Sequence, residues 1–397
     1  MYDAIVVGAR CAGSPTAMLL ARSGFRVLLV DRATFPSDTI STHILWPHGA
    51  EILARWRLLP RLAATGVPPI CRPMTFDVGP FALRGTIPDA NDGKGGYCPR
   101  RTVLDHLLVT AAADAGADVR ESFTVDEVLT DDHTVVGIRG HARSGRPLEE
   151  RAHLVIGADG VNSLVARAVQ APEYDTRPVE ACAYYSYFSG VEQDDIELYV
   201  RDYHAFGGVP THDHQHLVMV NWPAKDFPEV RTDVEGHVWR ALESAPDFSR
   251  RVRAGRREEK WHGTAGVPGY FRKPYGKGWA LIGDASYNRD PITAQGISDA
   301  FIDAESLVSS LTAAFSGERS FDAALSAHES TRNERVRPMY EFTEHLATLE
   351  PPPPEMQTLF GALRGKQEAT NAFLSAITGA IPIADFMSSE NIARIVG

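Results

Sequence analysis

The sequence predicts an α/β fold in which a doubly wound, Rossmann-like dinucleotide-binding domain is interleaved with an antiparallel β-sheet substrate domain and followed by C-terminal helices. Three observations predict it. Residues 1–32 are typical of a strand, a glycine-rich turn, a helix and a second strand. Residues 173–269 carry strand-like alternation and many aromatic residues. Two later buried strands each end in a polar turn, at Asp159-Gly160 and at Gly283-Asp284.

The first turn, residues 8–13, has the chemistry of an anion site. Gly8 permits a sharp bend, and the helix that follows presents free N–H groups and a positive dipole end. Gly13 lets that helix pack close to the strand. Asp31 ends the next strand about 20 residues later, where a carboxylate accepts hydrogen bonds from an adenosine ribose. The middle glycine of G-x-G-x-x-G is Arg10 here, so an ordinary βαβ unit with a tight turn remains the alternative.

Residues 35–157 are expected to leave this domain and then return to it. A hydroxyl-rich stretch at 35–43 precedes a helix expected over 47–56, and the Gly- and Pro-rich segment 68–99 predicts short strands and loops. A helix then opens at Arg101 and ends at Gly116. Strands expected at 118–123, 134–139 and 152–157 suit an antiparallel insert that leads back into the parallel sheet.

Strands are expected at 181–190, 197–201 and 217–222, forming a sheet with one apolar face. Its aromatic side chains are ordinarily core, although some could line a pocket for a flat, apolar substrate. Helices are expected from Ala294–Gly296 to about Phe315 and over 321–349, before a four-proline break and a helical tail. We therefore expect a dinucleotide-binding domain over 1–75, 100–172 and 270–349, a substrate domain over 76–99 and 173–269, and a C-terminal helical segment over 350–397.

Composition narrows the class of protein. The 397 residues are 44% hydrophobic and 23% charged, which is typical of a globular protein with more than one core. A net charge of −11 argues against a nucleic-acid partner, and no apolar run is long enough for an integral membrane span. The N-terminus carries no basic, apolar leader and the four cysteines show no C-x-x-C spacing, so we expect a cytoplasmic monomer or homodimer with free thiols. His212, His214 and His216 are expected at a solvated hairpin turn, without a metal.

Taken together, these motifs resemble a known family. The two-glycine turn, R-x-x-L at Arg101, Asp159-Gly160, and Gly283-Asp284 followed by Pro291 and Gly296 are similar to the group A FAD-dependent monooxygenases, which have the fold of para-hydroxybenzoate hydroxylase. Geranylgeranyl reductases and flavin halogenases belong to the broader neighbourhood. The resemblance covers roughly residues 1–349. The chain departs from the family pattern at Arg10, at Tyr287 where His is frequent, and at Ala294 where Gly is frequent.

The resemblance implies FAD as the cofactor. Gly8, Ala12 and Gly13 would hold the pyrophosphate, Asp31 the adenosine ribose, Arg101 the diphosphate or ribityl chain, and Asp284 the ribityl hydroxyls, while Asp159 would serve both FAD and the nicotinamide. The full set of residues expected at the cofactor is Gly8, Ala9, Arg10, Ala12, Gly13, Asp31, Arg32, Thr42, Arg101, Asp159, Gly160, Gly283, Asp284, Pro291, Gln295, Gly296 and Ile297. Independently of the resemblance, a helix that starts at 294–296 aims N–H groups at whatever precedes it, and a reduced flavin carries negative charge there.

The implied activity is a monooxygenase of the hydroxylase or epoxidase type. NAD(P)H would reduce FAD, and dioxygen would form a flavin hydroperoxide that transfers one oxygen atom to an aromatic or polycyclic, natural-product-type small molecule. Because the chain has one glycine-rich dinucleotide turn, NAD(P)H is expected as a transient co-substrate. His43, Tyr184 and Tyr203 are candidates for a catalytic base. The alternatives are a reductase of prenyl double bonds, a halogenase, whose expected W-x-W-x-I-P segment is absent, and a non-catalytic FAD-binding protein.

Overall fold

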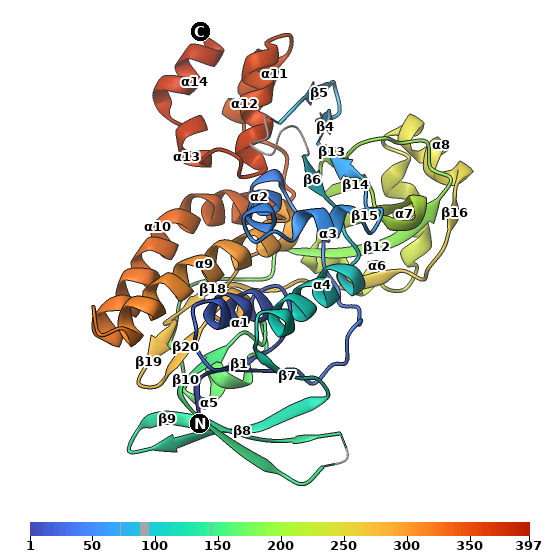
Figure 1. The fold of residues 1–397 in the computed structure, drawn as a ribbon. Coiled ribbons are helices and arrows are strands. Elements are labelled where there is room, and N and C mark those ends of the chain that lie inside the picture. Colours follow the sequence, from blue (N-terminus) through green and yellow to red (C-terminus); the bar gives the residue numbers. More distant parts are fainter. Residues whose placement is uncertain (72, 88–94, 144) are drawn as a thin grey trace.

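The computed structural model describes residues 1–71, 73–87, 95–143 and 145–397 (Figure 1). Its first layer is a parallel sheet, as the sequence predicts. In spatial order its strands are β20 (Trp279–Leu281), β10 (Leu148–Gly157), β1 (Tyr2–Val7), β2 (Val27–Val30) and β7 (Asp118–Arg120), with β19 (Tyr275–Gly276) antiparallel at one edge. Part of the Gly- and Pro-rich segment expected to form strands and loops, residues 72 and 88–94, lies outside the described residues.

The parallel sheet buries both of its faces. On β1, Ala4 and Val6 join one hydrophobic core, whereas Ile5 and Val7 join another. Successive side chains of a strand point to opposite faces, so a strand covered on both sides needs a continuous apolar run. The first core lies under three helices, α1 (Gly13–Arg22), α4 (Arg101–Asp114) and α9 (Gly296–Phe315). The second lies under α5 (Leu164–Ala168) and an antiparallel meander of β8 (Phe123–Asp131), β9 (Thr134–Ala142) and the start of β10.

A second, mostly antiparallel sheet packs beside the first layer. In spatial order its strands are β16 (Arg256–Arg257), β12 (Ala181–Ser189), β15 (Gln215–Pro223), β14 (His204–Pro210), β13 (Glu197–Arg201), β4 (Met74–Asp77) and β5 (Ala82–Gly85), with β17 (His262–Thr264) on β12. The β4–β5 hairpin joins through a parallel pairing that places Leu198 opposite Phe76. The early segment therefore completes a sheet built mainly by residues 181–223.

The expectation of one apolar face for this second sheet is wrong. On β15, Val218 and Val220 join a core with α7 (Val234–Leu242) and α8 (Pro246–Ala254), two helices within the segment that is expected to form strands. Leu217 and Met219 point to the opposite face, against a different core. The unbroken run Leu-Val-Met-Val at 217–220 is the sequence signal of a strand buried on both sides.

The C-terminal helices close one end of the molecule (Figure 1). After α10 (Phe321–Ala347), the proline run is extended up to Pro354, which is the first residue of α11 because proline is tolerated in a first helical turn. Phe360 and Phe373 from this region pack on Phe76 of β4. The four terminal helices are α11 (Pro354–Leu363), α12 (Gln367–Ile377), α13 (Ile383–Phe386) and α14 (Ser389–Val396).

Shorter elements connect these layers. The helices are α2 (Pro47–Arg55), α3 (Leu59–Ala63) and α6 (Phe227–Val230), and single 3₁₀ turns lie at His212–His214, Ala224–Asp226, Gly283–Ala285 and Pro291–Thr293. The strands are β3 (Pro69–Ile70) paired with β6 (Gly96–Tyr97), and β11 (Glu173–Arg177), β18 (Gly269–Arg272) and β21 (Tyr287–Asn288) in a small sheet. None of the helices in the described ranges combines the length and the apolarity that crossing a bilayer requires.

Candidate functional site

The three polar turns meet at the carboxyl edge of the parallel sheet. A Cβ added to Gly8 would lie 2.5 Å from the carbonyl oxygen of Ala158, and one added to Gly13 would lie 1.8 Å from that of Gly8. A Cβ on Gly283 would lie 2.7 Å from the Cβ of Ala12. The turns touch at positions where only glycine fits. The ends of β1, β10 and β20 therefore lie close together around one site.

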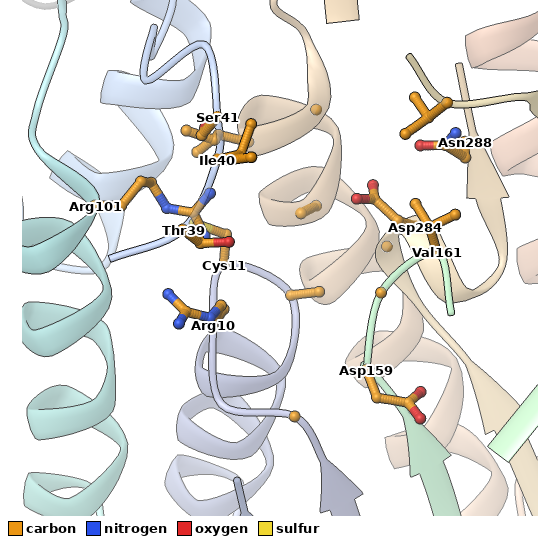
Figure 2. A pocket seen from close by; sticks show the side chains of 18 of the residues that line it. Arg10, Cys11, Thr39, Ile40, Ser41, Arg101, Asp159, Val161, Asp284 and Asn288 are labelled. Carbon is orange, nitrogen blue, oxygen red and sulfur yellow. The ribbon is translucent and has the colours of Figure 1, made fainter. Parts of the chain in front are cut away.

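A cavity of about 890 Å³ opens at this edge. Figure 2 shows Arg10 and Arg101 on one side of it and Asp159 and Asp284 on the other. The predicted cofactor residues that line it are Gly8, Arg10, Ala12, Asp31, Arg32, Thr42, Arg101, Asp159, Gly160, Gly283, Asp284, Pro291, Gly296 and Ile297. Ala9, Gly13 and Gln295 do not line it but lie next to residues that do.

The first turn offers unpaired donors to this cavity. Among the described residues, the backbone N–H groups of residues 10–13 donate no hydrogen bond, and the first bond of the helix runs from Ser14 N to Arg10 O. Asp31 accepts hydrogen bonds from Ala9 N and Ala33 N, both at 2.7 Å, through different carboxylate oxygens. Each oxygen keeps a further lone pair for a hydroxyl group. This arrangement fits a diphosphate and an adjoining ribose.

Arg10 and Arg101 share a buried carboxylate. The Arg10 guanidinium forms an ion pair with Asp105, and Arg101 donates to the same carboxylate at 3.0 and 3.1 Å. Asp105 is fully buried in α4 and was not predicted as part of the site. Its position four residues after Arg101, on the same helix face, is the one signal of it in the sequence.

Asp159 and Asp284 differ in what their carboxylates do. Asp159 accepts from Ser163 Oγ at 2.5 Å and from Leu164 N at 2.6 Å, so it caps the start of α5. The Asp284 carboxylate, in contrast, faces the cavity and accepts no hydrogen bond from the described residues. The Tyr270 hydroxyl donates a hydrogen bond to the backbone carbonyl of Asp284. Although the residue is exposed to the cavity, desolvation by the surrounding protein raises the pKa of Asp284 to about 6. Asp284 is therefore the carboxylate with capacity left for a polyol such as the ribityl chain.

The start of α9 supplies a second set of free donors. Ala294, just before it, adopts φ 54°, the left-handed conformation that glycine adopts most readily, which accounts for the glycine usual in the resembled family. The N–H groups of residues 296–298 donate no hydrogen bond among the described residues. A Cβ on Gly296, which lines the cavity, would meet no atom within 4 Å. This space and these donors fit the electron-rich edge of a flavin.

The three catalytic candidates lie in different surroundings. Tyr184 lines the cavity and stacks on Phe227. His43 is fully buried outside the lining, with Nδ1 2.6 Å from Ser41 O and Nε2 3.0 Å from the hydroxyl of Tyr187. Burial lowers the pKa of His43 to about 3, so the ring is neutral. Tyr203 is 50% exposed and does not line the cavity, so the structure does not bring it to the site.

Other cavity residues come from the second sheet and from the flanks of the turns. Tyr185, Leu217 and Met219 form part of the wall contributed by β12 and β15, and burial raises the pKa of Tyr185 to about 12. Tyr287, the departure from the family histidine, also lines the cavity, and its hydroxyl has no partner within the described part of the chain. Strand prediction alone does not show which face of a strand meets the cofactor domain.

The histidine-rich hairpin is not the solvated turn that the sequence predicts, because His212 and His216 are buried. His212 lies 2.8 Å from Thr65 Oγ1 and accepts from Arg100 N at 3.1 Å, and His216 Nε2 lies 2.7 Å from Gln193 O. Within residues 1–71, 73–87, 95–143 and 145–397, no cluster of three or more His, Cys, Asp or Glu side chains is arranged to hold a metal ion.

Comparisons with known proteins agree with this site. The family model described as "FAD binding domain" matches residues 1–343. The digeranylgeranylglycerophospholipid reductase of Methanosarcina mazei is 30% identical over 318 residues, which cover 75% of this chain and 72% of that protein.

Two solved structures share the fold. The myxobacterial chondrochloren halogenase CndH has a TM-score of 0.79 at 22% identity, covering 100% of this chain and 95% of its own. PqsL of Pseudomonas aeruginosa, described as a probable FAD-dependent monooxygenase, has a TM-score of 0.73 at 21% identity, covering 87% of this chain and 96% of its own. The predicted family is confirmed: the chain belongs to the FAD binding domain family of group A flavoprotein monooxygenases and is an FAD-dependent oxidoreductase.

Proposed function

We propose that this enzyme is a monooxygenase that uses NAD(P)H and dioxygen to insert one oxygen atom into a compact aromatic or polycyclic substrate. The observation that carries the proposal is the cavity wall formed by Tyr184, Tyr185, Leu217 and Met219, which line the same cavity as Pro291 and Ala294 at the start of α9. Pockets for drug-sized ligands occupy about 300–1,000 Å³. The cavity of about 890 Å³ is lined both by the predicted cofactor residues and by this wall, so FAD and the substrate would have to share it, which favours a compact substrate.

The residues of the chain divide the work between binding and protection from water. FAD, when bound, supplies two-electron redox chemistry and reaction with dioxygen. The free N–H groups at the start of α1 would bind its diphosphate, Asp284 its polyol chain, and the start of α9 its electron-rich edge. Tyr185 and Met219 would orient the substrate and exclude water from the reacting atoms.

Tyr184 and Tyr185 are the ionisable wall residues that a phenolic substrate would meet. Burial raises the pKa of both hydroxyl groups, so each stays protonated near neutral pH and can donate a hydrogen bond to a substrate oxygen. We assign them a binding role. His43 does not act as a base that touches the substrate, because its ring is buried outside the cavity lining.

A second candidate function is the reduction of prenyl double bonds. The observation that favours it is the 30% identity with the Methanosarcina mazei reductase over most of both chains. Such an enzyme would need no dioxygen, so the two functions are separated by their oxygen requirement.

The test combines substrate panels with control of oxygen. FAD-loaded enzyme is mixed with NADH or NADPH and with phenols, polyketides or prenyl compounds, and cofactor oxidation, oxygen uptake and product mass are recorded. We expect substrate-stimulated oxygen uptake and a product heavier by one oxygen atom. Saturation of an alkene under anaerobic conditions would contradict the monooxygenase and support the reductase. Met219→Trp should block substrate stimulation while FAD content stays unchanged.

A further inference from the structure

We infer that Asp105 is a positioning residue that draws the Arg10 guanidinium aside, so that the first turn can bind a diphosphate although its middle glycine is replaced. In a G-x-G-x-x-G turn the middle glycine lets the pyrophosphate approach the backbone. An arginine at that position adds a long, charged side chain at the point of closest approach. The chain must therefore hold this side chain elsewhere.

Arg10 is held on one side of the turn by several contacts. Its Nη1 forms an ion pair with Asp105 and lies 3.4 Å from Ser37 O, while its Nη2 donates to Ser37 Oγ at 3.0 Å and to Asp38 O at 3.2 Å. The guanidinium also lies 5.4 Å from the centre of the Phe35 ring. These contacts hold the guanidinium against α4 and residues 35–38. The backbone N–H groups of residues 10–13 stay free.

Asp105 is the centre of this arrangement. Its carboxylate has no exposed surface and accepts from Arg101 Nε at 3.0 Å, Arg101 Nη2 at 3.1 Å and Cys11 Sγ at 3.3 Å, besides the Arg10 ion pair. Arg10, Cys11 and Arg101 all line the cavity, whereas Asp105 does not. One buried carboxylate thus holds two guanidinium groups, including the one that stands in place of the middle glycine.

Arg10 can have one of two roles. If Arg10 is merely accommodated, the effect of Asp105 on Arg10 disappears when position 10 is glycine, and only its effect on Arg101 remains. If Arg10 itself binds the diphosphate, a glycine there weakens FAD binding whatever occupies position 105. A double-mutant cycle distinguishes these cases.

The experiment measures the dissociation constant of FAD by fluorescence titration of apoprotein for the wild type, Arg10→Gly, Asp105→Asn and the double variant. We expect Asp105→Asn to weaken FAD binding about tenfold or more, and Arg10→Gly to stay within about threefold of the wild type. The double variant should recover part of the loss, because Arg101 still lacks its carboxylate partner. A double variant as weak as Asp105→Asn, or a tenfold loss in Arg10→Gly alone, would overturn the inference. A purely structural role for Asp105 would show no such recovery.

Two further variants keep the test decisive. Asp114→Asn removes a carboxylate of the same helix whose partner, Arg61, is on the surface, and should leave FAD binding unchanged. If Asp105→Asn does not fold, Ser37→Ala loosens Arg10 without touching the buried carboxylate. It should weaken FAD binding about twofold to fivefold in the wild type and have no effect in Arg10→Gly; an equal effect in both backgrounds would count against the inference. Because only FAD binding is measured, the outcome is independent of which reaction the enzyme catalyses.

Discussion

The carboxylate of Asp31 accepts a hydrogen bond of 2.7 Å from the backbone N–H of Ala9, so the acid that ends β2 also holds the turn that ends β1. The same carboxylate lines the cofactor cavity. Turn shape and ribose recognition therefore depend on one side chain.

Asp31→Asn should weaken FAD binding by about 10- to 100-fold, because hydrogen bonds to a charged group contribute about 1.5–3 kcal/mol. Titration of apoprotein with FAD measures this. The matched control is Asp3→Asn, since Asp3 accepts a 2.7 Å bond from Arg26 N at the opposite ends of the same two strands. Equal losses in both variants would show that the bond acts through strand pairing rather than through the cofactor.

FAD binding should strengthen as pH rises from 5 to 7. The pKa of Asp284 is raised to about 6 by desolvation, and hydroxyl donors from the ribityl chain favour the ionised carboxylate. Dissociation constants measured across this range should fall in the wild type and stay flatter in Asp284→Asn. Burial also raises the pKa of Asp290, to about 7. Because Asp290 is present in both proteins, the difference between them reports the ionisation of Asp284.

The Asp284 contribution to the stability of the apoprotein should fall as pH rises, whereas FAD binding strengthens. The folded pKa of Asp284, about 6, lies above the value of about 3.9 in an unfolded chain, so the folded state binds more protons between these values. This carboxyl's contribution to the free energy of unfolding is fully present below about pH 4 and is lost as pH rises through 6. Denaturant unfolding of apo Asp284→Asn should lack this loss; an identical pH dependence in both proteins would refute the assignment.

Ala294→Gly should raise the free energy of unfolding by about 0.5–1 kcal/mol, because a left-handed backbone costs alanine about 1–2 kcal/mol and glycine little. Chemical denaturation of the two proteins measures the change. Ala313→Gly, in the helical part of α9, should instead lower stability by up to about 1 kcal/mol. Destabilisation by both substitutions would mean that the left-handed turn carries no strain.

The His43 ring should remain neutral from pH 8 down to pH 5. Burial is the main cause that lowers its pKa, to about 3, and the nearby Arg101 guanidinium adds to the effect. Nitrogen-15 NMR of the ring should show no titration in the folded protein and a transition near pH 6.5 in the unfolded chain. Because the folded pKa is lowered, this histidine contributes stability that is present above pH 6.5 and lost towards pH 3. A transition near neutral pH in the folded protein would restore His43 as a candidate base.

The cofactor half of the site could be predicted because its chemistry lies in local turns. Gly8, Asp159 and Asp284 each follow a buried strand within a few residues, and a parallel sheet brings such strand ends to one edge. The tertiary partners could not be predicted. Arg10 and Asp105 are far apart in sequence, and only the packing of α4 against α1 joins them.

The substrate half was predicted less well for a related reason. An aromatic residue of the second sheet can face the cavity from a strand, as Tyr185 does, or lie exposed in a turn between strands, as Tyr203 does. A strand pattern does not identify what covers each face. Helices α7 and α8 cover one face of the second sheet, and the strand pattern does not indicate that they do. The proposed domain bounds remain a prediction, and β4 (Met74–Asp77) spans the proposed boundary between residues 75 and 76.

The parallel pairing of β4 with β13 has a consequence for synthesis of the chain. Thr75 pairs with Glu197, so the β4–β5 hairpin emerges from the ribosome about 120 residues before the strand that it joins. During that interval its apolar side chains, Met74 and Phe76 among them, lack the neighbours that later bury them. The substrate sheet cannot be completed until most of the enzyme exists, and excision of residues 173–269 would leave this early hairpin without its partner.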